Sequence, residues 1–437
     1  MSRVNFKKTH LLAATALGLA GLMGMAPNAH ASGFGLREGS ADWLGNAFAG
    51  GEAKAYDAST VWSNPAGMAL LTQDQVAGDV SYIGPSAKFT GYNTNPIGGH
   101  LSGVTGGNAV SPAASGALFG VLALNPDWRL GFSVTNPYGE RTSYPKNWVG
   151  QYQGLVSSIT GIDFSAALSY KVNNNFSIGA GPVVEYFDAR LTQGINSGLI
   201  AFSTPNTPYY HNPAALNMPS GSADIHGSNV GVGYNIGLLY QFDDATRLGL
   251  DYHSRIRHDI NGTESVSFPQ QVTMSAKTSI TLPDSVGVSL YHQLTPALAL
   301  MGSLQWTHWD LFNNLTVRPA MGQNTVIQEN WRNTWFAGVG ANYQLDDRWM
   351  LQTGFSYDQS PVTDANRTSR VPDADHYNLG FGAQYKINPN TTFQLAYLHV
   401  FSPGGSINST ANAASGTLIG NYDVSDNSVT AGVNVLF

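Results

Sequence analysis

The chain has 437 residues, a formal net charge of -7 and 11% charged residues, less than half of the roughly 25% that is usual in soluble domains. Its mean hydropathy is only -0.13, and no stretch beyond the N-terminus reaches the roughly 18 continuous apolar residues of a membrane-spanning helix. These totals exclude a helical membrane protein and favour alternating apolar and small polar residues. The acidic balance, without any basic patch, argues against a nucleic-acid partner.

Residues 1–31 have the pattern of an export signal. Three positive residues precede an apolar run (11–26), and the small-x-small sequence AHA (29–31) marks a cleavage site. The alternative is an uncleaved anchor helix. Cleavage would remove three positive charges and no acid, which changes the net charge from -7 to -10. The sequence therefore predicts an exported chain.

Residues 32–73 contain no strand periodicity and are rich in Gly and Ala. Ser40 is suited to be the N-cap of a short helix, and Pro65 ends a second helical turn because it cannot continue the hydrogen-bond ladder. The tripeptide Asn64-Pro65-Ala66 is either a hinge or a fixed turn; a fixed turn is the default for an X-Pro pair. We expect a compact helical unit ahead of the first strand.

Residues 74–437 alternate with a period of two in runs of about 10 residues, as transmembrane strands require. Six short turns separate seven long polar stretches, which predicts 14 strands. The turns lie near residues 125–128, 172–175, 243–247, 293–297, 345–349 and 387–392. The long stretches lie near residues 90–113, 137–153, 193–228, 261–278, 316–331, 360–375 and 402–424.

A barrel of 14 strands has a lumen wider than side chains alone can fill. The compact unit at 32–73 is the only folded candidate to occupy it. We therefore predict an all-β fold: a 14-stranded antiparallel transmembrane β-barrel (74–437) plugged by a small N-terminal helical hatch (32–73). Such a barrel belongs in the outer membrane of a Gram-negative bacterium.

Five segments resemble the FadL/TodX family of outer-membrane transporters for long-chain fatty acids and hydrophobic compounds. They cover residues 32–51, 63–68, 282–294, 345–362 and 366–382. The resemblance implies a hatch, an apolar pocket and a kinked third strand through which ligand leaves sideways into the membrane. It also implies that the terminal Phe437 is read by the barrel-assembly machinery, although an apolar last strand explains this residue equally well.

Arg332 is the best candidate partner for a ligand carboxylate. Strand parity turns it inward together with Thr334 and Phe336, and the family places a basic ligand-contacting residue there. The alternative is that Arg332 only binds a loop carboxylate. Phe336 belongs to the small or apolar residues that we expect to line the bore.

The family's second basic position aligns near Gln193, where this chain has no cation. Arg190 is the closest basic residue, but strict parity turns it toward lipid, at a cost of about 2–4 kcal/mol at the midplane. A bulge started by Pro182 would turn it back. The departure leaves open an uncharged cargo such as an aromatic hydrocarbon.

Further residues are candidates for gating. Pro137 and Gly139 stand where the third strand bends, because Pro137 removes a ladder donor and Gly139 tolerates unusual torsions; the alternative is a simple strand end. The family resemblance implies that Phe34, near the mature N-terminus, acts as a movable stopper in the pocket.

The loop at 193–228 carries apolar residues, Leu199 and Phe202 among them, on an otherwise polar stretch. The resemblance implies that this loop captures ligand weakly; ordinary packing on the barrel rim is the alternative. Strand seven carries a series of charges that parity turns inward, as an ion-pair ladder or a head-group contact. These residues are Asp251, His253, Arg255, Arg257 and Asp259.

Passive uptake of long-chain fatty acids or similar hydrophobic molecules is the function that these features predict. A general porin and an outer-membrane hydrolase are the rivals, but a porin needs no hatch, and no catalytic motif joins the His residues to Ser or Asp. The sequence predicts no cofactor and no metal. The expected partners are the cargo, outer-membrane lipids, lipopolysaccharide and the assembly machinery, with the chain as a monomer.

Overall fold

The computed structural model describes residues 33–267, 270–412 and 414–437. The predicted signal sequence at 1–31 lies outside these residues. Within the described ranges, no helix is long and apolar enough to cross a membrane.

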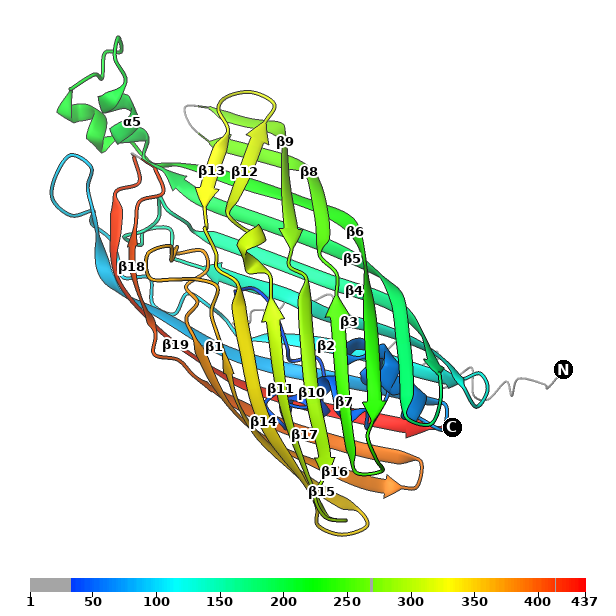
Figure 1. Ribbon diagram of the computed structural model, residues 1–437. Helices are drawn as coiled ribbons and strands as arrows, with labels where there is room; N and C mark the ends of the chain where they lie inside the picture. The colour runs from blue at the N-terminus through cyan, green and yellow to red at the C-terminus, as the bar shows by residue number, and fades with distance from the viewer. Residues whose placement is uncertain (1–32, 268–269, 413) are drawn as a thin grey trace.

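The described strands form one closed antiparallel barrel of 14 strands, as predicted (Figure 1). Six are continuous: β1 (Gln75–Thr94), β2 (Ala113–Ala123), β3 (Trp128–Ser143), β4 (Val156–Lys171), β5 (Phe176–Ile195) and β6 (Gly221–Gln241). Four are built from two segments each: β7 (Thr246–His253) with β8 (Ile256–Ser267), β9 (Gln271–Leu282) with β10 (Ser285–Gln293), β11 (Leu298–Thr307) with β12 (Asn314–Pro319), and β13 (Thr325–Gln328) with β14 (Thr334–Gln344). The last four are β15 (Trp349–Asp358), β16 (His376–Asn388), β17 (Thr391–Phe401) with β18 (Gly405–Ser409), and β19 (Thr417–Leu436).

The first and last strands close the barrel. β1 pairs with β19 from Gln75 opposite Leu436 to Thr94 opposite Thr417. The N–H of Phe437 donates to the carbonyl of Asp74 (2.9 Å), so the C-terminal aromatic residue lies at this seam.

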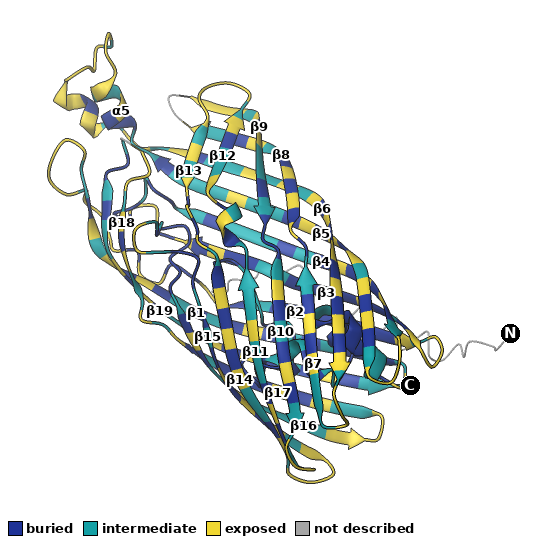
Figure 2. Cartoon of the chain, viewed as in Figure 1, coloured by how far each residue is buried: buried dark blue, intermediate teal, exposed yellow. Residues whose placement is uncertain are grey.

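Side-chain burial alternates along the strands, with apolar residues outward and small or polar residues inward (Figure 2). On β15, Leu351 and Phe355 are exposed, whereas Gln352 and Ser356 are buried. This pattern fits a sheet that faces lipid on one side and a filled lumen on the other. The predicted strand parity is confirmed here, and so are the six short turns.

Three of the predicted long loops contain much strand. In residues 402–424, β18 pairs with the first part of β19. Residues 261–278 are largely strand and residues 316–331 about half strand: β8 and β9 continue to a short connection, and β12 and β13 form a hairpin. Their outward residues, such as Lys277 and Arg318, are polar, while their inward residues, such as Ile280, are buried and apolar. This upper wall (β8, β9, β12 and β13) therefore has the polarity of a water-soluble sheet, which made it look like loop.

The hatch lies inside the barrel, toward the end that holds the C-terminus (Figure 1). It consists of four short helices: α2 (Ala41–Leu44), α3 (Gly51–Lys54), α4 (Thr60–Ser63) and the 3₁₀ helix η1 (Pro65–Leu70). Ser40 is the N-cap of α2, as predicted, and its Oγ accepts from the Asp42 N–H (3.2 Å).

Wall glycines let the hatch backbone come close. A Cβ added at Gly249 would stand 1.8 Å from the Glu52 carbonyl oxygen, and one at Gly354 would stand 2.0 Å from that of Asn46. Both are far below van der Waals contact. Only glycine is compatible with this contact between hatch and wall.

Polar side chains fix the hatch further. The Lys54 ammonium lies 2.9 Å from the Asp42 carboxylate, and both side chains are 2% exposed. From the wall, Gln352 and Gln384 donate to Asp42 Oδ1 (3.0 and 2.9 Å). Breaking such a buried pair by removing one partner costs about 3–5 kcal/mol. We call residues 41–71 the hatch body.

Candidate functional site

Residues 33–39, which precede the helix cap at Ser40, form an N-terminal segment that pairs with β3 inside the barrel. Gly35 forms an antiparallel bridge with Tyr138. The Leu36 N–H donates to the Pro137 carbonyl (2.7 Å). The segment thus attaches to the strand at the point where that strand is irregular.

The start of this segment is held by an acidic residue of the loop between β15 and β16. Asp373 Oδ2 accepts from the Gly33 N–H (2.9 Å) and from Ser360 Oγ (2.5 Å). Its Oδ1 lies 3.1 Å from His376 Nε2. One carboxylate therefore links the N-terminal segment to the barrel wall.

Phe34, in the same segment, is the centre of a cluster of aromatic rings. It is 1% exposed, and its ring centroid lies 5.0 to 6.0 Å from those of Tyr138, Trp309, Phe312 and Trp331. Three of these contacts are edge-on, the arrangement that aromatic pairs prefer.

Phe34 also closes one side of an apolar pocket in the upper wall. Inward residues of β4, β5, β8, β9 and β12 line this pocket, among them Ile159, Phe187, Ile260, Ile280 and Val317. Its volume is about 70 Å³, whereas pockets that hold drug-sized ligands measure roughly 300–1,000 Å³. The pocket is therefore too small for a long-chain ligand as it stands, and the role of Phe34 as a movable stopper stays a prediction.

Arg370 is a buried cation that lines the apolar pocket. It is 6% exposed, and its guanidinium donates to Gln193 Oε1 (2.9 Å) and Ser157 Oγ (3.2 Å). Burial lowers its pKa to about 10, so it remains charged at neutral pH. Glu329 lines the same pocket, and burial raises the pKa of its carboxyl to about 7.

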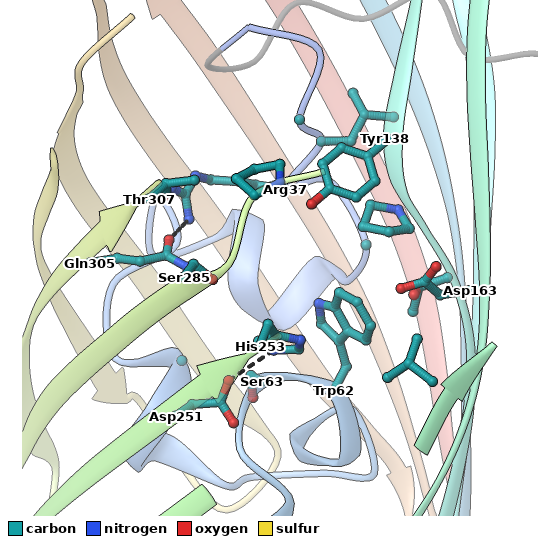
Figure 3. Close-up of a pocket in the computed structure, with 18 of the residues that line it drawn as sticks. Arg37, Trp62, Ser63, Tyr138, Asp163, Asp251, His253, Ser285, Gln305 and Thr307 are labelled. Atoms are coloured by element: carbon teal, nitrogen blue, oxygen red, sulfur yellow. Dashed lines mark hydrogen bonds and ion pairs between the residues drawn. The ribbon is translucent and has the colours of Figure 1, made fainter. Parts of the chain in front are cut away.

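A second cavity of about 200 Å³, which we call the polar chamber, is lined by Tyr138, the neighbour of Phe34 in the aromatic cluster (Figure 3). Its lining includes the carboxylates of Asp163, Glu185 and Asp251 together with the rings of Trp62 and Tyr138. The chamber and the apolar pocket thus meet at the aromatic cluster but differ in chemistry.

The β3 irregularity opens the wall beside the polar chamber. The pairing of β3 with β4 shifts between Thr135 and Tyr138, and the pairing of β3 with β2 ends at Val134, opposite Leu118. β2 continues to Ala113 with β1 alone. Two neighbouring strands separate here. Among the described residues, Ser115 Oγ donates to Asn136 Oδ1 (3.4 Å) across the gap, and the chain before β2 meets β3 again at the bridge between Val110 and Thr142.

The sequence model of the family described as outer membrane protein transport protein (OMPP1/FadL/TodX) matches residues 22–437. The chain belongs to this family. It is 30% identical over 420 residues to outer membrane protein P1 of Haemophilus influenzae, with 89% of each chain covered. It is 27% identical over 423 residues to the long-chain fatty acid transport protein of Escherichia coli (strain K12), covering 90% of this chain and 92% of that protein.

Among solved structures, a FadL homologue of Pseudomonas aeruginosa has a TM-score of 0.86 and 25% identity, with 93% of this chain and 100% of that chain covered. Membership in the FadL/TodX family places the chain in the outer membrane, and the family is one of transport proteins.

The inward position predicted for Arg332 is wrong. Residues 329–333 are not strand, so parity counted back from Phe336 fails at Arg332. The Arg332 side chain is 43% exposed and lies 3.3 Å from Asp375 Oδ1, and its Nε donates to the Ser360 carbonyl (3.0 Å). It therefore binds a loop carboxylate, the alternative stated for it.

Arg190 and the loop residues also lie away from both cavities. Arg190 points outward on β5 and forms an ion pair with Asp224 (2.5 Å), as strict parity predicted. Leu199 and Phe202 belong to α5 (Ser197–Ser203), which projects beyond the barrel rim (Figure 1). Leu199 is buried within this loop, and Phe202 packs on His211.

Phe336 points inward, as predicted, and is 3% exposed. It contacts the N-terminal segment, because the Arg37 guanidinium lies 4.3 Å from its ring centroid. It does not line either of the two cavities in the described structure.

The tripeptide Asn64-Pro65-Ala66 is a buried turn that begins η1. Asn64 Oδ1 accepts from the Ala66 N–H (3.0 Å), and its Nδ2 donates to the Leu238 carbonyl (3.0 Å). Ser177 Oγ donates to the Ala66 carbonyl (2.9 Å). These contacts are those of a fixed turn, while a gating role for it stays a prediction.

Strand seven does not carry a continuous inward ladder. The chain leaves the strand between His253 and Ile256, and this break reverses the parity beyond it. Asp251 and His253 point inward, but Arg257 and Asp259 are 65% and 67% exposed at their side chains. His258 takes the buried position instead.

Arg370 is the functional candidate that sequence reasoning missed. It stands in a loop without periodicity, so no parity argument reaches it. Two signals were available: it belongs to the family-like segment 366–382, and the family's cation is missing near Gln193. Arg370 places its guanidinium beside that same Gln193.

Proposed function

We propose that this chain takes up long-chain fatty acids across the outer membrane by passive diffusion. The observation that carries the proposal is the apolar pocket with a buried cation, Arg370, on its lining and a displaceable ring, Phe34, on another side. A relative with 27% identity is named a long-chain fatty acid transport protein, which supports the same cargo.

Binding needs no chemical reaction or energy source. Transfer of a chain from water to an apolar site is worth about 0.8 kcal/mol per CH₂, on the order of 10 kcal/mol for a 16-carbon chain. The Arg370 guanidinium offers the ligand carboxylate a charge-assisted hydrogen bond, worth about 1.5–3 kcal/mol. A water-filled porin would require neither a hatch nor an apolar pocket.

Release follows from the path below the pocket. When Phe34 leaves the aromatic cluster, the apolar pocket and the polar chamber become continuous, because Phe34 and Tyr138 stand between them. The hatch body closes the end of the lumen, so the gap between β2 and β3 is the exit. Pro137 and Gly139 lie at this gap, and the exit leads sideways into the membrane.

An aromatic hydrocarbon is the second candidate cargo. The resting pocket of about 70 Å³ is closer in size to a single ring than to a long chain. The rings around Phe34 would stack on such a ligand.

The remaining partners belong to the same proposal. The chain would lie among outer-membrane lipids and lipopolysaccharide, and the assembly machinery would read the last strand through Phe437. The seam between β1 and β19 closes the sheet within one chain, which supports a monomer.

Substitution of Arg370 tests the cargo. In Arg370→Gln, we expect binding of palmitate to weaken about tenfold or more, while binding of methyl palmitate changes little, because only the acid carries a carboxylate. Arg370→Lys should keep part of the affinity. Fluorescence titration of purified protein measures both ligands.

Arg332→Gln is the matched control, because it removes an exposed guanidinium outside the pocket. Equal losses for acid and ester in Arg370→Gln would contradict the carboxylate role. Uptake of toluene, but not of palmitate, by cells that produce the wild-type protein would favour the aromatic cargo instead.

A further inference from the structure

Two acidic residues face each other directly in the wall of the polar chamber. Asp163 on β4 and Glu185 on β5 are Cα partners in the pairing of these strands. They are 2% and 0% exposed, and both line the chamber. Like charges directly opposite in a sheet are destabilising, so this pair requires a proton or a cation nearby.

A hydrogen bond joins the two carboxyl groups, so the pair holds a proton and carries a single negative charge. Glu185 Oε1 also lies 2.8 Å from His258 Nε2. Asp163 has no ion pair among the described residues. Oδ1 of Asp251 has no hydrogen-bond partner among them, and its other oxygen lies 2.8 Å from His253 Nε2.

The cations that surround the chamber are already engaged. Arg37 forms an ion pair with Asp358 (2.9 Å). His253 lies against Asp251, as the dashed line in Figure 3 shows. A fourth carboxylate of the lining, that of Glu52, accepts from Ser289 Oγ. The described lining of the chamber therefore offers buried acceptor oxygens, and its two cations, Arg37 and His253, are already paired.

Aromatic rings stand beside these oxygens. Trp62 and Tyr138 line the same space as Asp163, and Figure 3 shows the three side chains around one side of the chamber. An organic cation gains both from a carboxylate and from the faces of aromatic rings. The described residues contain no group of three or more ligating side chains suited to a metal ion, which favours an organic cation over a metal.

We propose that the polar chamber is a binding site for alkylammonium ions, with the Asp163–Glu185 pair as the anionic partner and Trp62 and Tyr138 as the aromatic walls. The volume of about 200 Å³ suits a short alkyl amine. The site lies beside the gap between β2 and β3, since Thr135 at the β3 irregularity is the Cα partner of Asp163. The proposal goes beyond fatty acid uptake and does not depend on it.

The test uses three ligands with six carbons each: n-hexylammonium, hexan-1-ol and hexanoate. Calorimetric titration of the purified full-length protein in a nonionic detergent measures their affinities at neutral pH. We expect hexylammonium to bind about tenfold or more tightly than either other ligand. Asp163→Asn should abolish this preference, because it removes the charge while preserving the shape of the side chain.

Asp259→Asn is the matched control: it removes an acid on the outer face of β8, with a side chain 67% exposed, and should leave hexylammonium affinity within about twofold. Trp62→Leu should reduce the affinity for hexylammonium without changing the affinity for hexan-1-ol. Heat-dependent migration on gels confirms that each variant is folded.

Equal affinity for the three ligands, or a preference for hexylammonium that survives in folded Asp163→Asn, would overturn the proposal. Arg370→Gln separates the two proposals. This variant should weaken the binding of palmitate and leave the affinity for hexylammonium unchanged. A wild-type protein that fails to bind palmitate would therefore count only against fatty acid uptake.

Discussion

The hatch body and the N-terminal segment lie in one lumen but are held there differently. The hatch body is fixed by the buried pair of Lys54 and Asp42 and by backbone contacts that only wall glycines such as Gly249 permit. The start of the N-terminal segment, residues 33–36, is held by one β-bridge at Gly35 and by the carboxylate of Asp373, whereas Arg37 at its end forms an ion pair with Asp358.

This difference shows which part of the plug is able to move. Displacing the hatch body would expose a buried charge and many backbone contacts at once, whereas displacing residues 33–36, ahead of Arg37, breaks a few hydrogen bonds and one aromatic cluster. Opening by the segment alone is therefore the less costly change.

The largest expected effect comes from the hatch body. Lys54→Met leaves Asp42 as an uncompensated buried charge, so we expect a loss of about 3–5 kcal/mol in the free energy of unfolding. Arg257→Met, which breaks an exposed pair with Asp259, should cost about 1 kcal/mol or less. Denaturant unfolding in detergent, followed by gel migration, compares the two. Similar losses would mean that the hatch body is not rigidly anchored.

A smaller effect is expected from Asp373, whose carboxylate holds the start of the N-terminal segment. Asp373→Ala removes the acceptor of the Gly33 N–H, a charge-assisted bond worth about 2 kcal/mol. Amide hydrogen exchange should become faster at residues 33–36 but not in α2, α3 or α4. Asp364→Ala, on the same loop with a side chain 65% exposed, is the control. Faster exchange throughout the hatch would show that segment and body move together.

The smallest effect concerns pH. Burial, and secondly the nearby charge of Asp426, raises the pKa of Glu38 from 4.5 to about 7. A carboxyl whose pKa is raised in the closed state stabilises that state fully below pH 4.5, and this contribution is lost as the pH rises through 7. Between pH 6 and 8 the segment should loosen by about 1 kcal/mol.

Hydrogen exchange of residues 33–39, corrected for intrinsic rates, measures this shift. Glu38→Gln should remove the pH dependence, because the amide does not titrate. A segment that becomes tighter with rising pH would contradict the assignment to Glu38.

Strand parity predicted most of the barrel because lipid and lumen impose opposite requirements on alternate residues. The inward positions of Phe336 and Gln352 follow directly from this rule. The rule fails wherever the chain leaves the strand for a few residues. Such interruptions at 254–255 and 329–333 explain why the inward orientations predicted for Arg257 and Arg332 are wrong.

Arg370 and Asp373 escaped prediction for a different reason. Both lie on the loop between β15 and β16, whose path depends on contacts with distant parts of the chain: Gln193 for Arg370 and Gly33 for Asp373. No local pattern encodes such contacts. The approach of Phe34 to the pocket, in contrast, could be expected from the family resemblance.

The upper wall built by β8, β9, β12 and β13 is polar on its outer surface and apolar on its inner surface. Substitutions on its inner surface, at positions such as Ile280 or Val317, reshape the cargo site without altering any residue that touches the bilayer. Selection for new cargo can therefore act on the upper wall while the lipid-facing surface of the barrel stays unchanged. One scaffold can in this way come to accept different hydrophobic molecules.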